Sequence, residues 1–188
     1  MSKSAFYTAK GDHGDTGRLA GTERIAKSSA LIEAIGTLDE ATSAIGMARA
    51  LSQSDLLRAA LATVQRHVSG IMSHLSAVPE ARDQYAGVTD EDLTWLEDLI
   101  ADIEKHLPPL KSFVLPGDSQ AGAALHVART IVRRAERRLV ALADGEPRLG
   151  KANLAYLNRL SSLMFVAALY ENNTRSTRPE LGRRLSGS

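Results

Sequence analysis

The chain has 188 residues, 44% of them hydrophobic and only 4% aromatic, which predicts one domain with a core of alanine, leucine, isoleucine and valine. Its net charge of +1 gives no overall attraction to nucleic acid, and the absence of cysteine excludes disulfides, thiol catalysis and thiolate metal sites. The N-terminus lacks an apolar leader, and the longest apolar run, Leu163 to Tyr170, is too short to span a bilayer. We therefore expect a cytoplasmic protein with no membrane or nucleic-acid partner.

The composition of residues 1–28 predicts an irregular polar segment before the first helix, which we call the arm. Gly11, Gly14, Gly17 and Gly21 are spread through it, together with hydroxyl and charged side chains. Glycines allow backbone N–H groups to converge on phosphate oxygens, while Thr and Lys add donors and positive charge. The Walker pattern is absent. Because a flexible terminal arm has a similar composition, the pattern alone leaves both interpretations open.

A first helix is predicted from about Ser29 to Leu51. Asp39 lies beside its apolar stripe, whereas Glu33 and Glu40 point away from it. A carboxylate on an apolar flank predicts a partly buried ion pair. Such a pair is either an ordinary interhelical salt bridge or one that positions another group.

The second and third helices follow the same apolar spacing. The second spans about Ser54 to Val78, and a polar stretch from Pro79 to Gly87 ends it. The third begins at Thr89, where Glu91 and Asp92 suit the positive end of a helix, and it stops before Pro108.

A loop from Leu110 to Gly117 leads to the fourth helix, which Asp118 or Ser119 is expected to cap. Phe113 is the only aromatic residue of this loop. Spacing alone favours a core residue at the start of the helix, and a ligand contact is the alternative.

The fourth helix carries charges where a solvated helix would not place them. Its core-facing stripe is Leu125, Ala128, Val132, Ala135, Leu139 and Leu142. Arg134 and Arg138 fall on the side opposite this stripe and face water. Arg129, Arg133 and Glu136 fall at the border between the apolar stripe and the polar side, which we call the shoulder of the stripe. Charges on a shoulder are half-desolvated and need a partner or a ligand, unless they snorkel to water.

The fifth helix covers about Lys151 to Asn172 and contains Asn158, which is either a satisfied interhelical amide or a ligand contact. Residues 173–188 predict a flexible basic tail. No strand pattern is evident, so we expect an all-α bundle of five helices in a single domain, 1–172, with the arm as 1–28 and the bundle as 29–172. His67 and His74 lie two helical turns apart, too far to chelate one ion, and no protein metal site is predicted.

Four sequence blocks occur together in a recognisable order. They are Tyr7-Thr-Ala-Lys-Gly-Asp-His-Gly-Asp-Thr-Gly17, Gly36-Thr-Leu-Asp-Glu40, Phe113-Val-Leu-Pro-Gly117 followed by His126-Val-Ala-Arg-Thr-Ile-Val-Arg-Arg-Ala-Glu-Arg137, and Tyr156-Leu-Asn-Arg-Leu-Ser161. From about residue 6 to residue 172, the chain resembles the ATP:cob(I)alamin adenosyltransferases of the propanediol-utilisation type. The block that begins at His126 is highly specific.

The resemblance implies a ferritin-like up-and-down bundle that assembles as a homotrimer, with ATP held at the subunit interfaces. It implies transfer of the 5′-deoxyadenosyl group of ATP, with Mg²⁺, to the cobalt of reduced cob(I)alamin, which gives adenosylcobalamin and triphosphate. It also implies a cobalamin-dependent (B12-dependent) enzyme that receives the product.

The resemblance further implies site residues. Asp39 and Arg129 match the family's intersubunit ion pair, and Phe113 matches the aromatic residue beneath the corrin ring. Excluding the lower axial ligand makes cob(II)alamin easier to reduce, and Co(I) then attacks C5′ of ATP without a protein nucleophile. The residues at positions that match the ATP site are Thr8, Lys10, Gly11, Asp12, Thr16, Gly17, Lys27, Arg133, Arg134, Glu136, Arg137 and Asn158.

Five positions depart from the family pattern, and most of them are on the corrin-facing side: Ala9, Ser69, Met72, Asp118 and Ser162. Altered corrinoid preference or lower activity is therefore one expectation. A competing interpretation is a corrinoid- or nucleotide-binding chaperone or sensor with the same fold and little catalysis. Turnover of cob(I)alamin and ATP separates the two. A helical scaffold that binds nucleic acid is disfavoured by the low net charge and by the position of the arginines beside the apolar stripe of the fourth helix.

Overall fold

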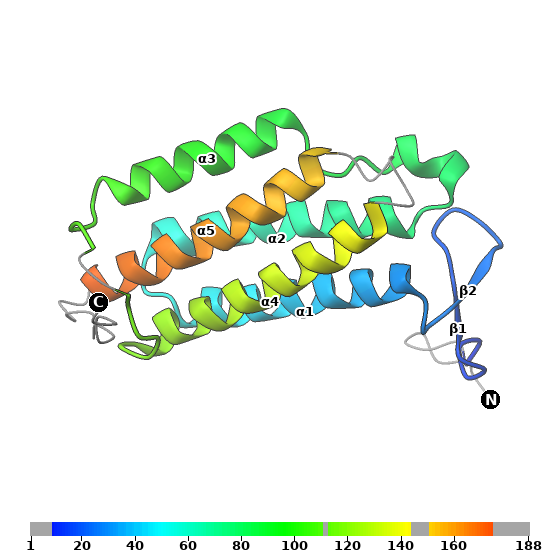
Figure 1. Ribbon diagram of the computed structural model, residues 1–188, viewed down its shortest axis with the longest axis horizontal. Coiled ribbons are helices and arrows are strands. Elements are labelled where there is room, and N and C mark those ends of the chain that lie inside the picture. Colours follow the sequence, from blue (N-terminus) through cyan, green and yellow to red (C-terminus); the bar gives the residue numbers. More distant parts are fainter. Residues whose placement is uncertain (1–8, 111–112, 144–150, 175–188) are drawn as a thin grey trace, which may run out of the picture.

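The computed structural model describes residues 9–110, 113–143 and 151–174. Over these residues the chain is mostly helical, as the sequence predicted. The helices are α1 (Ala30–Leu51), α2 (Asp55–Ser76), the short 3₁₀ helix η1 (Pro79–Gln84), α3 (Asp90–Glu104), α4 (Gln120–Ala143) and α5 (Lys151–Thr174). Helix α1 packs against α2 and α4, α4 packs against α5, and α5 packs against α3. The helices thus lie alongside one another in an elongated bundle (Figure 1).

Hydroxyl side chains fix the helix starts close to where the sequence placed them. The hydroxyls of Ser29 and Ser54 each accept a hydrogen bond from the amide three residues later, at 3.4 and 3.3 Å. Thr89 and Asp92 form a reciprocal capping box at the start of α3. Of the two candidates at α4, Ser119 is the cap, because its hydroxyl accepts from the amide three residues later at 2.9 Å.

The core lies between the inward faces of α1, α2, α4 and α5, and buried residues of α3 join it. The stripe predicted for α4 is confirmed, since all of its members are buried except the half-buried Leu142. Alanines among leucines, isoleucines and valines allow close helix packing. None of the helices in the described ranges is long and apolar enough to cross a membrane.

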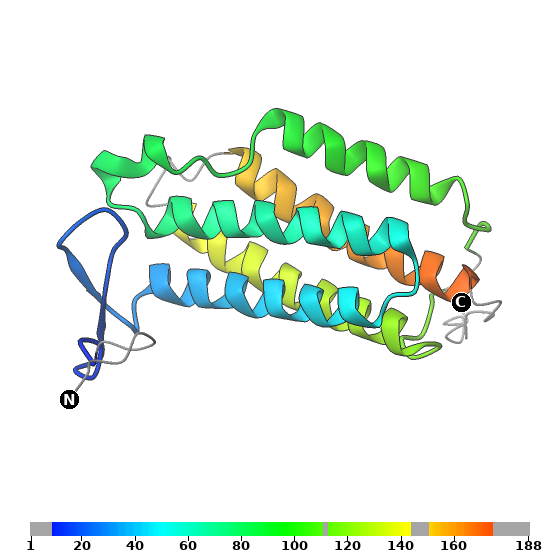
Figure 2. The ribbon, with the colours of Figure 1, turned by 180° about the vertical axis from the view of Figure 1, so that it is seen from behind.

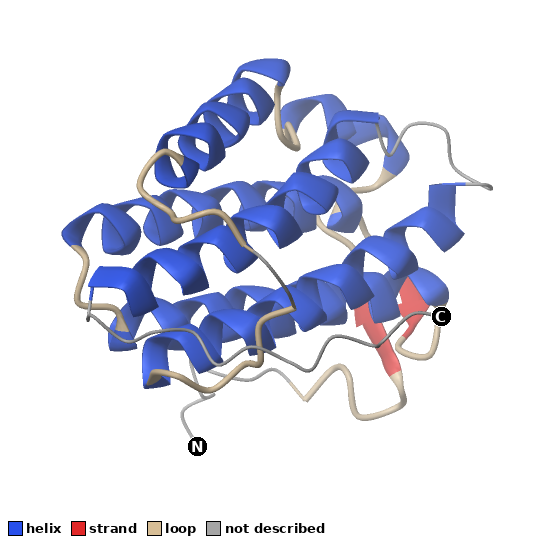
Figure 3. Ribbon diagram, turned by 60° about the vertical axis from the view of Figure 1, so that its left-hand side comes forward, coloured by secondary structure: helices blue, strands red, loops and turns tan. Residues whose placement is uncertain are grey.

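The arm is not irregular, contrary to the prediction, and it contains the strands that the sequence did not reveal. Strands β1 (Asp15–Gly17) and β2 (Arg24–Ala26) pair antiparallel, with Thr16 opposite Ile25. The hairpin lies beyond the end of the bundle, beside the start of α1 and the end of α2 (Figures 1 and 2). Figure 3 shows the two short strands in red against the blue helices. With three residues each, the strands are too short to display an alternating pattern.

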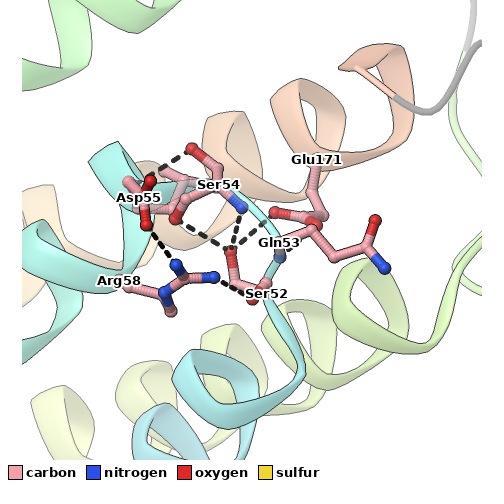
Figure 4. A network of polar contacts seen from close by, with 7 residues as sticks. Ser52, Gln53, Ser54, Asp55, Arg58 and Glu171 are labelled. Atoms are coloured by element: carbon pink, nitrogen blue, oxygen red, sulfur yellow. Dashed lines mark hydrogen bonds and ion pairs between the residues drawn. The ribbon is translucent and has the colours of Figure 1, made fainter.

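The opposite end of the bundle is tied together by the buried Glu171. Its carboxylate accepts hydrogen bonds from the Ser52 hydroxyl at 2.7 Å and from the Gln53 amide at 3.0 Å (Figure 4). These bonds join α5 to the link between α1 and α2. Helix α5 runs through this contact to Thr174, beyond its predicted end at Asn172. The remainder of the predicted tail lies outside the described residues.

Candidate functional site

The arm is folded on itself by basic side chains that contact its own backbone. Lys27 Nζ donates to the Gly11 carbonyl at 2.8 Å, and Arg24 Nη2 donates to the Lys10 carbonyl at 2.7 Å. Arg24 also pairs with Asp15 at 2.6 Å, and this hydrogen bond lowers the pKa of the Asp15 carboxyl. The result is a compact loop with exposed Lys10 and Lys27 at its edge, which suits a phosphate group.

Two positions in this loop require glycine. Gly14 has a φ of 84°, a left-handed conformation that side chains disfavour. A Cβ on Gly11 would lie 3.1 Å from Lys27 Nζ and 3.2 Å from the Asp15 carbonyl oxygen. Asp12 is exposed on the same loop. Thr8, the remaining predicted arm residue, lies outside the described residues.

A cavity of about 290 Å³ lies between the hairpin and the first two helices. Its wall is formed by Thr16, Gly17, Arg18, Leu31, Ile32, Ile35, Gly36, Asp39, Met72 and Ser76. Asp39 places a carboxylate on a mainly apolar wall, as the helical wheel predicted, although its side chain is exposed rather than half-buried. The structure therefore brings Thr16 and Gly17 of the arm to the same cavity as Asp39.

A second group of polar residues lies on a different face, on the flank of α4 that meets α5. Asn158 Nδ2 donates to Glu136 Oε1 at 2.8 Å. Arg129, Arg133 and Arg137 follow one another at four-residue intervals along this flank. Arg129 and Glu136 are half-buried as predicted, whereas Arg133 is exposed, contrary to the wheel, because it lies further round the helix.

Asp39 and Arg129 do not meet within one chain: no ion pair joins them over the described residues. Instead, Arg129 Nε is buried without a hydrogen-bond partner among the residues that the structure describes, and so are both ring nitrogens of His126, which is 4% exposed. Burial, assisted by the Arg129 charge and opposed by Asp118, lowers the pKa of His126. Each buried donor without an acceptor costs about 1–3 kcal/mol. This flank of α4 therefore holds several buried polar nitrogen atoms without partners among the described residues.

Arg134 faces α1 instead of α5. It forms an ion pair with Glu40, and Arg138 pairs with Glu33 at 3.3 Å along the same contact. Both arginines are exposed, as predicted, but the two glutamates are their partners rather than solvated side chains. The structure thus separates Arg134 from Asn158, with which the family resemblance had grouped it.

Phe113 is 87% exposed in the segment that precedes α4. The core position favoured by spacing alone is therefore wrong. Leu115, two residues later, is also exposed, at 45%. Both side chains are therefore accessible to a ligand or a partner.

A sequence model of the cobalamin adenosyltransferase family matches residues 6–171. The chain belongs to this family. It is 42% identical to the corrinoid adenosyltransferase of Bacillus subtilis, over 89% of this chain and 86% of that relative. It is 35% identical to the corrinoid adenosyltransferase PduO of Salmonella typhimurium, over 90% of this chain and 50% of that relative.

Solved structures of the family have the same fold. A phenylalanine-to-alanine variant of the PduO-type ATP:corrinoid adenosyltransferase from Lactobacillus reuteri, complexed with cobalamin and ATP, has a TM-score of 0.87. It is 32% identical and the match covers 95% of this chain and 99% of that chain. An arginine-to-lysine variant of that enzyme, complexed with ATP, has a TM-score of 0.86 at 32% identity, over 95% of this chain and 100% of that chain.

Two residues of this adenosyltransferase fold escaped the sequence analysis. Arg18 lines the cavity and donates to the Ala77 carbonyl, 59 residues away in the sequence, at 2.5 Å. Glu171 is fully buried although it stands among polar residues near the end of a helix. In each case the partner is remote in the chain, so local patterns carry no signal of the contact.

Proposed function

We propose that this protein transfers the 5′-deoxyadenosyl group of ATP to the cobalt of a reduced corrinoid, giving adenosylcobalamin and triphosphate. One observation carries the proposal: over 95% of its length the chain matches a family member that was solved with both ATP and cobalamin. Because ATP is the cosubstrate, we assign the reaction to the cytoplasm.

The arm is the proposed triphosphate cradle. Lys10 and Lys27 supply positive charge at its edge, and the absence of a side chain on Gly11 lets Lys27 pack closely against the loop. Thr8, Asp12, Thr16 and Gly17 complete this half of the ATP site. Mg²⁺ would be carried by the triphosphate with an oxygen of the exposed Asp12 as the arm ligand, and when bound it neutralises charge on the leaving group.

The second half of the ATP site is the flank of α4 that faces α5. Arg133 and Arg137 would neutralise the nucleotide's negative charge, while the Asn158–Glu136 hydrogen bond, 2.8 Å long, holds two polar groups ready for its ribose and base. Arg134 belongs to this half only through the resemblance. Its ion pair with Glu40 would have to break before it reached the nucleotide.

Phe113 is the proposed corrin contact. An exposed aromatic ring can pack under the flat corrin and exclude the lower axial ligand and water. Cob(II)alamin without that ligand accepts an electron more readily from a separate one-electron reductant, which this chain does not supply. The resulting Co(I) gives its electron pair to C5′ of ATP, the C5′–O bond breaks, and triphosphate leaves with the electrons of that bond. No protein nucleophile takes part, so positioning and charge neutralisation are the work of the protein.

We further infer that the active unit is a homotrimer of ferritin-like bundles with ATP between subunits. Two observations support this: Asp39 and the α4 flank lie on different faces of one chain, and Arg129 Nε is buried without a partner in the described residues. A neighbouring copy that presents Asp39 to Arg129 would join the two halves of the site.

An anaerobic assay tests the function. Purified protein, chemically reduced cob(I)alamin and MgATP should produce the absorption spectrum of adenosylcobalamin together with one triphosphate per product. Omission of ATP, and replacement of ATP by AMP, are the controls. Tight binding of ATP and corrinoid without turnover would refute the enzyme and favour a binding protein with this fold, the alternative raised by the departures at Ser69, Asp118 and Ser162.

A further inference from the structure

The hairpin of the arm is docked on the C-terminal end of α2, and Arg18 is at the centre of the contact. Arg18 Nη2 donates to the Ala77 carbonyl at 2.5 Å, and Nη1 pairs with Glu23 at 3.3 Å. On either side, the Leu19 amide donates to Ser76 at 2.9 Å and the Val78 amide donates to Leu19 at 3.0 Å. The distal turn of the hairpin is thereby joined to the residues that follow α2.

The chemistry of this contact is that of a cation at a helix C-terminus. Ala77 is the residue that caps α2, and the last carbonyls of a helix lack intrahelical donors and carry partial negative charge. The Arg18 side chain is only 9% exposed, so its hydrogen bond to Ala77 is shielded from water. Charge-assisted hydrogen bonds in such surroundings are among the stronger ones.

Arginine suits this position for a reason of shape. Its planar fork reaches the Ala77 carbonyl and the Glu23 carboxylate at the same time, whereas a lysine presents a single ammonium. The position has a disadvantage, because Arg18 Nε is buried with no acceptor among the described residues. Arg18 thus keeps its two other polar contacts although one donor stays unpaired. These contacts fix the position of the hairpin against the end of α2.

That geometry bears on the proposed nucleotide site. Arg18 directly follows Thr16 and Gly17, and all three residues line the cavity that contains Asp39. Docking of Arg18 therefore sets the distance between the arm and the wall formed by α1. Without the Arg18 side chain, the distal turn of the hairpin would be held on α2 mainly by the two backbone hydrogen bonds of Leu19.

We propose that Arg18 is a positioning residue of the nucleotide arm, which holds the proposed phosphate cradle against the bundle before ATP binds. The inference rests on the proposed ATP-dependent reaction, but it concerns binding of ATP rather than the chemical step. The corrin-facing Phe113 lies in a separate segment, so the contact should affect ATP and leave the corrinoid unchanged.

Arg18→Met tests the proposal, since it keeps the length of the side chain and removes both polar contacts. Loss of a charge-assisted bond should raise the Kd of MgATP and the KM for ATP by about tenfold. The kcat at saturating ATP and the KM for the corrinoid should stay within about twofold of wild type. Hydrogen exchange of the Leu19 and Val78 amides should quicken by about tenfold or more, because these amides report the docked hairpin directly.

Arg18→Lys should fall between wild type and Arg18→Met. Glu23→Gln, which removes only the 3.3 Å ion pair, should raise the Kd of MgATP by about twofold and serves if Arg18→Met does not fold. Arg66→Met is the matched control, an exposed arginine of α2 whose hydrogen bond stays within its own helix. It should change none of these quantities.

Faster amide exchange with an unchanged Kd for MgATP would overturn the proposal, and so would an equal fall of kcat and thermal stability with no change in the KM for ATP. If wild type binds MgATP but produces no adenosylcobalamin, the proposed function fails. The Kd and exchange measurements would still decide whether Arg18 positions the arm.

Discussion

Mixing two inactive variants should restore adenosyl transfer, because the proposed site takes Asp39 from one copy and Arg129 from the next. Asp39→Asn damages only the cavity face of a chain, and Arg129→Ala damages only the α4 flank. Removal of one member of a desolvated pair typically costs about 3–5 kcal/mol, so each variant alone should retain less than about 1% of the activity.

The recovery has a definite size. In an equal mixture with free exchange, an interface is intact when its Asp39 comes from an Arg129→Ala chain and its Arg129 from an Asp39→Asn chain. Each condition holds for half of the chains, so about a quarter of the interfaces should regain both residues in a closed ring. The mixture should show about a quarter of the wild-type rate. The KM for ATP should equal that of wild type, because only the repaired interfaces are active.

The assay is adenosylcobalamin formation from cob(I)alamin and MgATP after co-refolding of the two variants, with native mass spectrometry to verify mixed oligomers. Arg129→Ala mixed with Arg133→Ala is the matched control. Both changes lie on the α4 flank, so every interface stays damaged and no activity should return. Two results would refute a site formed by Asp39 of one copy and Arg129 of the next. One is a mixture of Asp39→Asn and Arg129→Ala that forms mixed oligomers but stays inactive, and the other is activity in the control mixture.

Phe113→Ala should change the thermal midpoint little, since the side chain is 87% exposed, and it should slow adenosylation from cob(II)alamin far more than from pre-reduced cob(I)alamin. Equal loss in both assays would argue against a role beneath the corrin. Glu171→Ala should lower the free energy of unfolding by about 2–4 kcal/mol in urea titrations, because it removes the carboxylate that accepts hydrogen bonds from the Ser52 hydroxyl and the Gln53 amide; a change below about 0.5 kcal/mol would contradict this account. Burial holds the pKa of His126, and that of His67, below the unfolded value. The neutral forms therefore stabilise the fold fully above about pH 6.5, and stability should decline as the pH falls below that value. His126→Gln should flatten this decline in thermal scans, and a wild-type midpoint that is constant between about pH 7 and 5 would rule the linkage out. Lys27→Ala should raise the KM for ATP by about tenfold through loss of a phosphate partner, and ATP saturation identical to wild type would exclude Lys27 from the cradle.

The helical part of the fold was readable from the sequence because its signals are local. Caps such as Ser29 and Thr89 stand immediately before runs with helical spacing, and the stripe on α4 predicted which side is buried. The hairpin was not readable, because its three-residue strands depend on contacts such as Arg24 with Asp15 rather than on alternation of apolar residues.

The site was predictable only in part. A helical wheel identified the unusual settings of Asp39 and Arg129, but it cannot tell whether two flanks face each other within one chain. The wheel also predicted correctly that Arg134 is exposed. It could not predict the ion pair with Glu40, because Glu40 lies on another helix. Spacing was misleading about the burial of Phe113 for a similar reason: it favoured a core residue, whereas the packing of the loop against the rest of the chain leaves the ring exposed.

Asp39 and the α4 flank are different surfaces of the same molecule, and this has a consequence for assembly. In the proposed assembly the Asp39 face of one copy meets the α4 flank of the next, so each contact is head-to-tail rather than the self-paired contact of a two-fold dimer. Any linear pair or short row would end in one unmatched carboxylate and one unmatched guanidinium, whatever its length. Only closure into a ring uses every copy of both groups. A substitution that altered the angle between neighbours without weakening the contact would therefore yield open, growing chains of subunits rather than smaller species.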